Sequence, residues 1–311
     1  MTGGSPAEPT PAEPTPTGPT PTGPDRSAGA WDADLAFAIE LAGEAGTVLM
    51  DRYERLERID HKTATDVVTE ADHLSEELVM AAIRRRYPAD SILAEESGAH
   101  APEAKAAEAG PVADPAPSAA PSPCSSDGSG RIWVIDPLDG TVNYANGLPV
   151  FCVSIGLVVD DRPTVGVVLD PTRGETFAAT VDGPATLNGR PIRASAKDKL
   201  SDYVISLGLA GRSVSSRARA LRREIRVARS MGSAALGLAY VGNGRFDAFV
   251  QETSLSAWDL AAAGLIAERA GAVVTAMDGS RWYDPARPPR GAGVVAAPPA
   301  FHGRIRELAR G

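Results

Sequence analysis

The sequence reads Trp133-Val-Ile-Asp136-Pro-Leu-Asp139-Gly140-Thr141 at its most informative point. An apolar run, expected as a strand over 131–135, leads into two aspartates, and a glycine and a threonine precede an expected helical turn. Carboxylates at the end of a rigid strand can share Mg²⁺, which prefers oxygen ligands. Gly140 lets a ligand approach the backbone, and amides that begin a helix favour phosphate. Taken alone, the two aspartates fit an Asp-Pro turn followed by a helix cap as well as they fit a metal site.

Three further acidic segments stand at the ends of expected elements. Glu95-Glu96-Ser97 follows a short strand expected at 91–94, and Asp259 opens an alanine-rich helix. Thr69 and Asp72 match a capping box. Each segment has an ordinary explanation as a solvated turn or a helix cap. Together they supply the converging carboxylates that a two-metal or three-metal phosphatase requires. The acidic residues at element ends are Asp66, Asp72, Glu95, Asp136, Asp139 and Asp259.

Other types of site find no support in the sequence. It contains no GxSxG, no P-loop and no GxGxxG that opens a helix after a strand. The four histidines show no metal spacing, with His100 in a low-complexity segment, and the two cysteines form no CxxC pair. The net charge of −9 argues against nucleic-acid binding. No apolar run reaches membrane-spanning length, and the first residues show neither the charged nor the apolar region of a secretory signal, so we expect a cytoplasmic protein.

Two low-complexity segments interrupt the chain. Residues 1–28 are rich in proline and threonine, and about 99–130 are rich in alanine, proline and serine. We expect the first to be a disordered tail and the second a mobile insertion. Elsewhere, two long helices precede a run of strands and then mixed elements, which predicts layered α+β rather than a βαβ repeat. The expected helices are 32–53, 70–86, 232–241, 258–270 and 300–309, and the later strands are 150–159, 164–169, 176–180, 246–250 and 272–275.

The four acidic segments resemble, in order, those of the inositol monophosphatase family. The most specific matches are Trp133–Tyr144 and Trp258-Asp259-Leu-Ala-Ala-Ala-Gly264, and the resemblance runs from about Asp32 to Ala309. It implies the layered αβαβα sandwich shared with fructose-1,6-bisphosphatase, within a phosphatase domain at 29–311. That domain would have an N-terminal α+β lobe at about 29–195, a C-terminal α/β lobe at about 196–311, and form a homodimer.

The resemblance also implies roles for individual residues. Mg²⁺ would be bound by Glu95, Asp136, Asp139, Asp259 and the Leu138 carbonyl. The catalytic residues would be Glu95, Asp72 and Thr141, the last two orienting the attacking water. The substrate would contact Gly140, Thr141, Ala234, Glu252 and Asp259. Lys62 resembles a basic residue near the metal site.

The activity implied is Mg²⁺-dependent hydrolysis of a small phosphate monoester, by direct in-line attack of a metal-activated water. Glu252 favours a polyol such as myo-inositol 1-phosphate, because a carboxylate can accept hydrogen bonds from adjacent hydroxyls. It could also accept the cation of histidinol phosphate, which is the second candidate. Fructose-1,6-bisphosphate, 3′-phosphoadenosine nucleotides and a non-catalytic binding role remain as alternatives.

Overall fold

The computed structural model describes residues 29–55, 59–63, 66–102, 130–209, 214–284 and 286–311. Trp31–Gly311 form one compact unit. The tail predicted at 1–28 and most of the predicted insertion lie outside the described residues. The insertion does not begin at Ala99, however, because strand β4 (Gly98–His100) pairs with β3 (Ser91–Ala94). His100 therefore belongs to an ordered hairpin, where its ring lies 2.7 Å from the Ser97 hydroxyl.

The larger sheet has eight strands in the order β10-β9-β8-β7-β6-β5-β3-β4. All neighbours are antiparallel except β3 and β5, which run parallel. Its central strands are buried along almost their whole length, as expected for a sheet covered on both faces. The remaining strands of this sheet are β5 (Arg131–Asp139), β6 (Cys152–Val159), β7 (Arg162–Asp170), β8 (Glu175–Thr180), β9 (Thr186–Leu187) and β10 (Arg190–Pro191).

The smaller sheet has five strands in the order β12-β11-β13-β15-β14. β11 pairs in parallel with β12 and β13, whereas β15 pairs antiparallel with β13 and β14. A separate hairpin joins β1 (Ile59–Thr63) and β2 (Asp66–Thr69). The strands of the smaller sheet are β11 (Val204–Gly208), β12 (Val227–Arg229), β13 (Ala248–Leu255), β14 (Val273–Ala276) and β15 (Ala292–Ala297).

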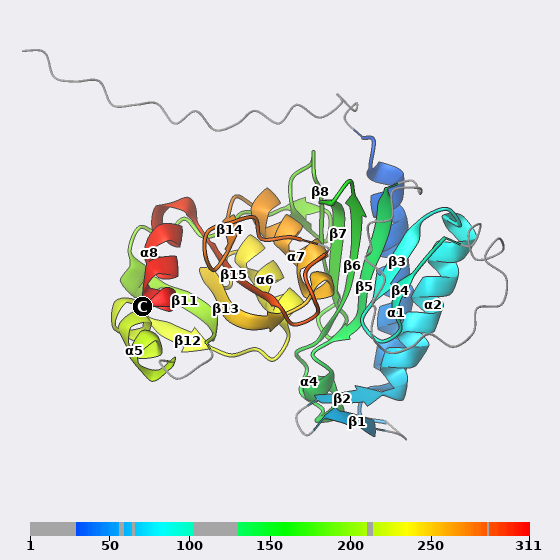
Figure 1. The fold of residues 1–311 in the computed structure, drawn as a ribbon, viewed down its shortest axis with the longest axis horizontal. Coiled ribbons are helices and arrows are strands. Elements are labelled where there is room, and N and C mark those ends of the chain that lie inside the picture. The colour runs from blue at the N-terminus through cyan, green and yellow to red at the C-terminus, as the bar shows by residue number, and fades with distance from the viewer. Residues whose placement is uncertain (1–28, 56–58, 64–65, 103–129, 210–213, 285) are drawn as a thin grey trace, which may run out of the picture. The chain divides into compact units, whose positions relative to one another are not determined.

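Helices cover both sheets, so that the layers follow the order αβαβα (Figure 1). α1 and α2 pack on one face of the larger sheet, α6 and α7 lie between the two sheets, and α8 covers the other face of the smaller sheet beside α5. The predicted fold class is confirmed. The helices are α1 (Asp32–Arg52), α2 (Glu70–Arg86), α4 (Thr141–Ala145), α5 (Val214–Glu224), α6 (Ala234–Gly242), α7 (Ala257–Arg269) and α8 (Pro299–Arg310), with a 3₁₀ turn η1 (Leu200–Asp202).

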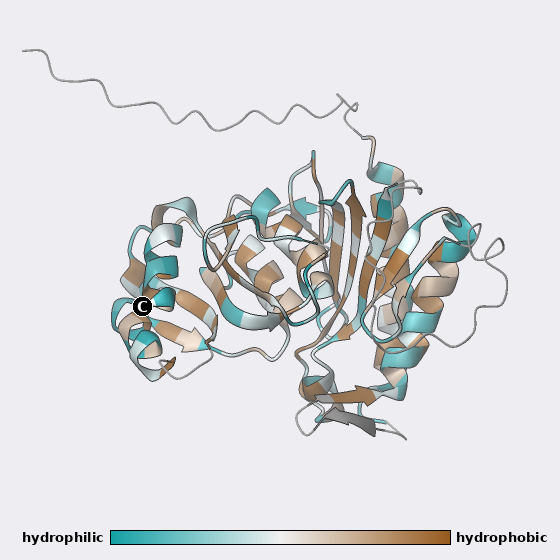
Figure 2. Cartoon of the chain, in the orientation of Figure 1, coloured by the Kyte–Doolittle hydropathy of each residue, from teal (hydrophilic) through white to brown (hydrophobic). Residues whose placement is uncertain are grey.

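Small residues allow the middle layer to pack closely. A Cβ at Gly156 or Gly166 would come within 2.8 Å of atoms of Ala261 or Ala262, so the larger sheet can touch α7 only where these strands lack side chains. Hydrophobic residues concentrate on the central strands and on α6 and α7 (Figure 2). This contact fixes the start of α7, which carries Asp259, against the sheet. None of the described helices is long and apolar enough to cross a membrane.

The predicted helices and strands are confirmed, with ends that differ by up to five residues. Several other elements of the structure were not predicted. α5 has an apolar stripe of only three residues, Val214, Ala218 and Leu221, in a short segment rich in arginine. β15 consists of alanine, glycine and valine, a composition that does not distinguish a strand from a helix. β5 continues four residues beyond its predicted end at Ile135. Its pairing with β6 becomes irregular between Asp136 and Asp139.

Candidate metal and substrate site

Three aspartates from two elements meet at one point. Asp136 and Asp139 end β5, Asp259 lies in the first turn of α7, and one carboxylate oxygen of each lies within 4.8 Å of the others. Glu95 joins them through a side-chain hydrogen bond to Asp136. Because β3 and β5 are parallel neighbours, the residues that follow them emerge at the same sheet edge. The structure therefore brings together four predicted metal ligands from three parts of the sequence.

The electrostatics of this cluster fit a bound cation. Burial raises the pKa of Asp136 well above its usual value, and the charges of Glu95, Asp139 and Asp259 raise it further. Burial and the charge of Asp139 likewise raise the pKa of Asp259. Like charges this close disfavour ionisation unless a positive charge offsets them. An oxygen-only donor set is the type that Mg²⁺ prefers, so the residues present fit that ion.

Asp139 is held in place by the start of α6. Its Oδ2 accepts hydrogen bonds from the Ser233 hydroxyl at 2.6 Å and the Ala235 N–H at 2.8 Å, and its Oδ1 accepts from the Ala234 N–H at 3.1 Å. The first N–H groups of a helix lack partners within the helix, and its N-terminus favours negative charge. Asp139 thus caps α6 from another element, which fixes its carboxylate orientation.

Asp72 and Thr141 form a second polar group. The predicted capping box of α2 is confirmed, with Asp72 accepting from the Thr69 N–H at 2.8 Å and the Thr69 hydroxyl at 2.7 Å. The other Asp72 oxygen lies 3.1 Å from the Thr141 hydroxyl, which is also 3.0 Å from the Leu138 carbonyl oxygen. Burial raises the pKa of Asp72 to about 6. Since the threonine proton can serve one acceptor at a time, the hydroxyl oxygen keeps lone pairs that can accept from a water molecule.

Gly140 links these groups, and its conformation requires glycine. Its φ is 98°, and an added Cβ would lie 2.9 Å from the Val150 carbonyl oxygen. We expect Gly140→Ala to destabilise the protein by about 2 kcal/mol or more, from the unfavourable backbone conformation and the contact together. Urea unfolding measures the loss.

Gly43→Ala is the matched control for Gly140→Ala. Gly43 lies in α1, has ordinary helical backbone, and no heavy atom lies within 4 Å of an added Cβ. Alanine there should increase stability by about 0.5–1 kcal/mol, because it reduces the freedom of the unfolded chain. Equal effects of the two substitutions would contradict the special role of Gly140.

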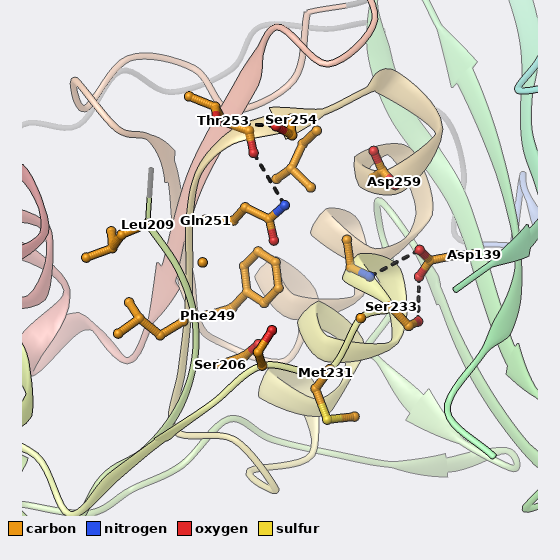
Figure 3. Close-up of a pocket in the computed structure, with 16 residues that line it drawn as sticks. Asp139, Ser206, Leu209, Met231, Ser233, Phe249, Gln251, Thr253, Ser254 and Asp259 are labelled. Carbon is orange, nitrogen blue, oxygen red and sulfur yellow. Dashed lines mark hydrogen bonds between the residues drawn. The ribbon is translucent and has the colours of Figure 1, made fainter. Parts of the chain in front are cut away.

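A cavity of about 410 Å³ opens beside the carboxylates and extends to the smaller sheet (Figure 3). Asp139 and Asp259 line one side, together with Gly232, Ser233 and Ala234 of the segment that starts α6. The opposite wall carries neutral polar groups, and among the described residues that line the cavity none is a lysine or arginine. The other polar residues of the lining are Ser206, Ser230, Gln251, Thr253 and Ser254, and the apolar ones include Leu207, Leu209, Met231 and Phe249, with Ser230 and Met231 directly preceding Gly232.

Comparison with known proteins identifies the family of this chain. The profile of the inositol monophosphatase family matches residues 31–311. The chain belongs to this family. An inositol-1-monophosphatase of Synechocystis is 37% identical over 257 residues, covering 79% of this chain and 81% of the relative. The Nus factor SuhB of Pseudomonas aeruginosa is 36% identical over 259 residues, covering 80% of this chain and 87% of the relative. The solved structure of an inositol monophosphatase from Anabaena is 32% identical, covers 90% of this chain and 96% of its own, and has a TM-score of 0.71.

The family resemblance predicts that Glu252 contacts substrate, but the structure pairs it elsewhere. Both Glu252 oxygens accept from the Arg217 guanidinium, at 2.6 and 2.8 Å, while Gln251 and Thr253 on either side line the cavity. Arg217 is 7% exposed and also donates to the Ala309 carbonyl at the end of α8. A substrate contact for Glu252 stays a prediction. The side chains of Lys62 and Asp66 lie outside what the structure describes.

The sequence did not reveal the residues that hold the predicted metal ligands in place. The Glu76 carboxylate accepts from the backbone N–H groups of Glu96 at 3.0 Å and Ser97 at 2.9 Å, which fixes the turn that carries Glu95. Glu76 is 4% exposed and lies one helical turn after Asp72. A carboxylate on the buried face of an amphipathic helix was the available signal. Ser233, the N-cap of α6, gave no such signal.

Proposed function

We propose that this chain is a Mg²⁺-dependent phosphatase that hydrolyses a small, neutral, hydroxylated monophosphate, with myo-inositol 1-phosphate as the leading substrate. One observation carries the proposal: Asp139 and Asp259 of the acidic cluster line the same cavity as a wall of hydroxyl and amide groups. A phosphate bound beside the carboxylates would place its alcohol part against that wall.

Each polar group has a proposed task in this reaction. Glu95, Asp136, Asp139, Asp259 and the Leu138 carbonyl would hold Mg²⁺. When bound, the ion would offset charge on the phosphate oxygens and make a water molecule more acidic. The N–H groups of Gly140 and Thr141 would position the phosphate. The Thr141 hydroxyl, held by Asp72, would accept a hydrogen bond from the attacking water and so fix its direction.

The lining of the cavity favours a polyol over the alternatives. A second phosphate, as in fructose-1,6-bisphosphate or a 3′-phosphoadenosine nucleotide, would call for a cationic side chain, and the described residues that line this cavity include none. The cation of histidinol phosphate would need a carboxylate outside the metal cluster, and Glu252, which follows Gln251 in the chain, is paired with Arg217. A non-catalytic role without a bound cation does not account for the crowded, buried carboxylates, because buried charges destabilise a fold unless they are neutralised.

Phosphate release from a panel of substrates tests the proposal. With Mg²⁺ present, we expect kcat/KM for inositol 1-phosphate to exceed that for histidinol phosphate and fructose-1,6-bisphosphate by at least about tenfold. EDTA should abolish release from all three. Preference for the bisphosphate, or release that EDTA leaves unchanged, would contradict the proposal. The homodimer and the cytoplasmic location stay predictions, and light scattering of the purified chain tests the first.

A further inference from the structure

Strand β13 departs from regular pairing where it passes the cavity. Gln251 pairs with Val294 and Leu255 with Ala292, so four steps along β13 match two along β15. Within this bulge Ser254 has a φ of 72°, and its N–H donates to the Arg290 carbonyl at 3.1 Å. Residues 253 and 254 of a regular strand would face opposite sides, yet both line the cavity here. Bulges commonly re-aim side chains in this way, and such strained residues gather at functional sites.

Gln251 begins the bulge and extends its amide into the cavity (Figure 3). Its Nε2 donates weakly to the Thr253 carbonyl at 3.3 Å. Its strand partner on β11 is Gly208, where an added Cβ would lie 3.2 Å from the Gln251 Oε1. The absence of a side chain at Gly208 therefore leaves room for the amide. A side-chain amide offers both donors and an acceptor, which suits the two hydrogen-bonding functions of a hydroxyl group.

We infer that Gln251, placed by the β13 bulge, is the specificity-determining residue that binds hydroxyl groups of the leaving alcohol. The inference rests on the proposed function and differs from the expectation for Glu252, whose carboxylate the buried Arg217 holds. Among the described residues that line the cavity, Gln251 alone carries a side-chain amide, and it reaches in from the wall across from Asp139. It contacts the alcohol and takes no part in the chemistry at phosphorus.

Gln251→Leu removes both hydrogen-bonding functions and keeps a side chain of similar size. We expect kcat/KM for inositol 1-phosphate to fall roughly tenfold, corresponding to one or two neutral hydrogen bonds. The fall should appear mainly in KM, because the contact is the same in the bound substrate and the transition state. Hydrolysis of p-nitrophenyl phosphate, which lacks hydroxyl groups on its ring, should fall far less. Gly208→Ala, which crowds the amide without removing it, should give a smaller change of the same selectivity.

Glu252→Gln separates the two neighbouring candidates. If Gln251 binds the hydroxyl groups, the ratio of kcat/KM for inositol 1-phosphate to that for p-nitrophenyl phosphate changes more in Gln251→Leu than in Glu252→Gln. The reverse order, an equal loss for both substrates in Gln251→Leu, or no loss would overturn the inference. Thermal unfolding shows whether either variant fails to fold, in which case Gly208→Ala decides the question.

Failure of the proposed function would look different. A wild-type protein that hydrolyses neither substrate refutes the phosphatase proposal itself. Calorimetric binding of inositol 1-phosphate in the presence of Mg²⁺ then tests Gln251 separately. Roughly tenfold weaker binding to Gln251→Leu supports its contact with hydroxyl groups, whereas unchanged affinity, or no binding to the wild type, overturns it.

Discussion

Asp136→Asn is expected to reduce Mg²⁺-dependent phosphate release by about 10³-fold or more, because a carboxamide lacks the charge that would hold the ion. The fold should survive. The Asp136 Oδ1 accepts from the Leu138 N–H at 3.0 Å, and the carbonyl oxygen of asparagine can do the same. Phosphate release and circular dichroism measured on one preparation check both statements. Near-normal turnover at saturating Mg²⁺ would refute the metal assignment.

The same substitution should stabilise the metal-free protein at neutral pH. Burial and neighbouring carboxylates raise the pKa of Asp136 in the fold, so the unfolded chain ionises first as pH rises. The metal-free fold therefore loses stability as pH rises above the usual carboxyl value near 3.8 until the raised folded pKa is passed. Asparagine does not ionise and removes this loss.

Thermal unfolding in EDTA at pH 5 and pH 8 measures the effect on stability. The Tm of the wild type should fall more between the two pH values than that of Asp136→Asn. Asp161→Asn is the matched control, since Asp161 is an exposed turn residue with a φ of 60°, a conformation that asparagine tolerates. This control should change neither activity nor the pH dependence of Tm. A control that behaved like Asp136→Asn would show that general surface charge, rather than the cluster, sets the stability.

Thr141→Val should lower kcat by about 10²–10³-fold with little change in Tm, because it deletes the hydroxyl between Asp72 and the proposed water while keeping a similar shape. The capping box of α2 does not depend on this hydroxyl, since Asp72 accepts from Thr69 with its other oxygen. The Thr141 hydrogen bond lowers the pKa of Asp72, so its loss should move the acidic limb of the residual activity to higher pH.

Thr47→Val controls for the loss of a threonine hydroxyl as such. The Thr47 hydroxyl donates to the Gly43 carbonyl at 2.9 Å on α1, away from the cavity. Its removal should leave kcat unchanged. Single-turnover measurements would show whether Thr141→Val slows the chemical step or substrate binding. An unchanged kcat in Thr141→Val would exclude a role for this hydroxyl in orienting the water.

The sequence by itself determined the elements that follow local rules. The helix at 70–86 carries its own start signal in Thr69 and Asp72, and that capping box is present as predicted. The sequence allows Asp259 to be an N-cap, but in the structure Ser256 is the N-cap of α7. Asp259 lies at the third helical position and accepts from the Ser256 N–H, which completes the capping box. The sequence also grouped Glu95, Asp136 and Asp139, because each stands at or just beyond the expected end of a strand, and the structure brings their carboxylates together.

Only the tertiary structure decided how these residues are held and what faces them. Asp139 is fixed by α6, which begins 95 residues later in the chain, and Glu252 is paired with Arg217 of α5, 35 residues earlier. The bulge in β13 turns Gln251, Thr253 and Ser254 toward one cavity, which a regular alternation would not predict. Local spacing determines helices, strands and caps because those depend on neighbouring residues. Partners of a carboxylate and the walls of a cavity depend on contacts between distant segments, which form only when the layers pack.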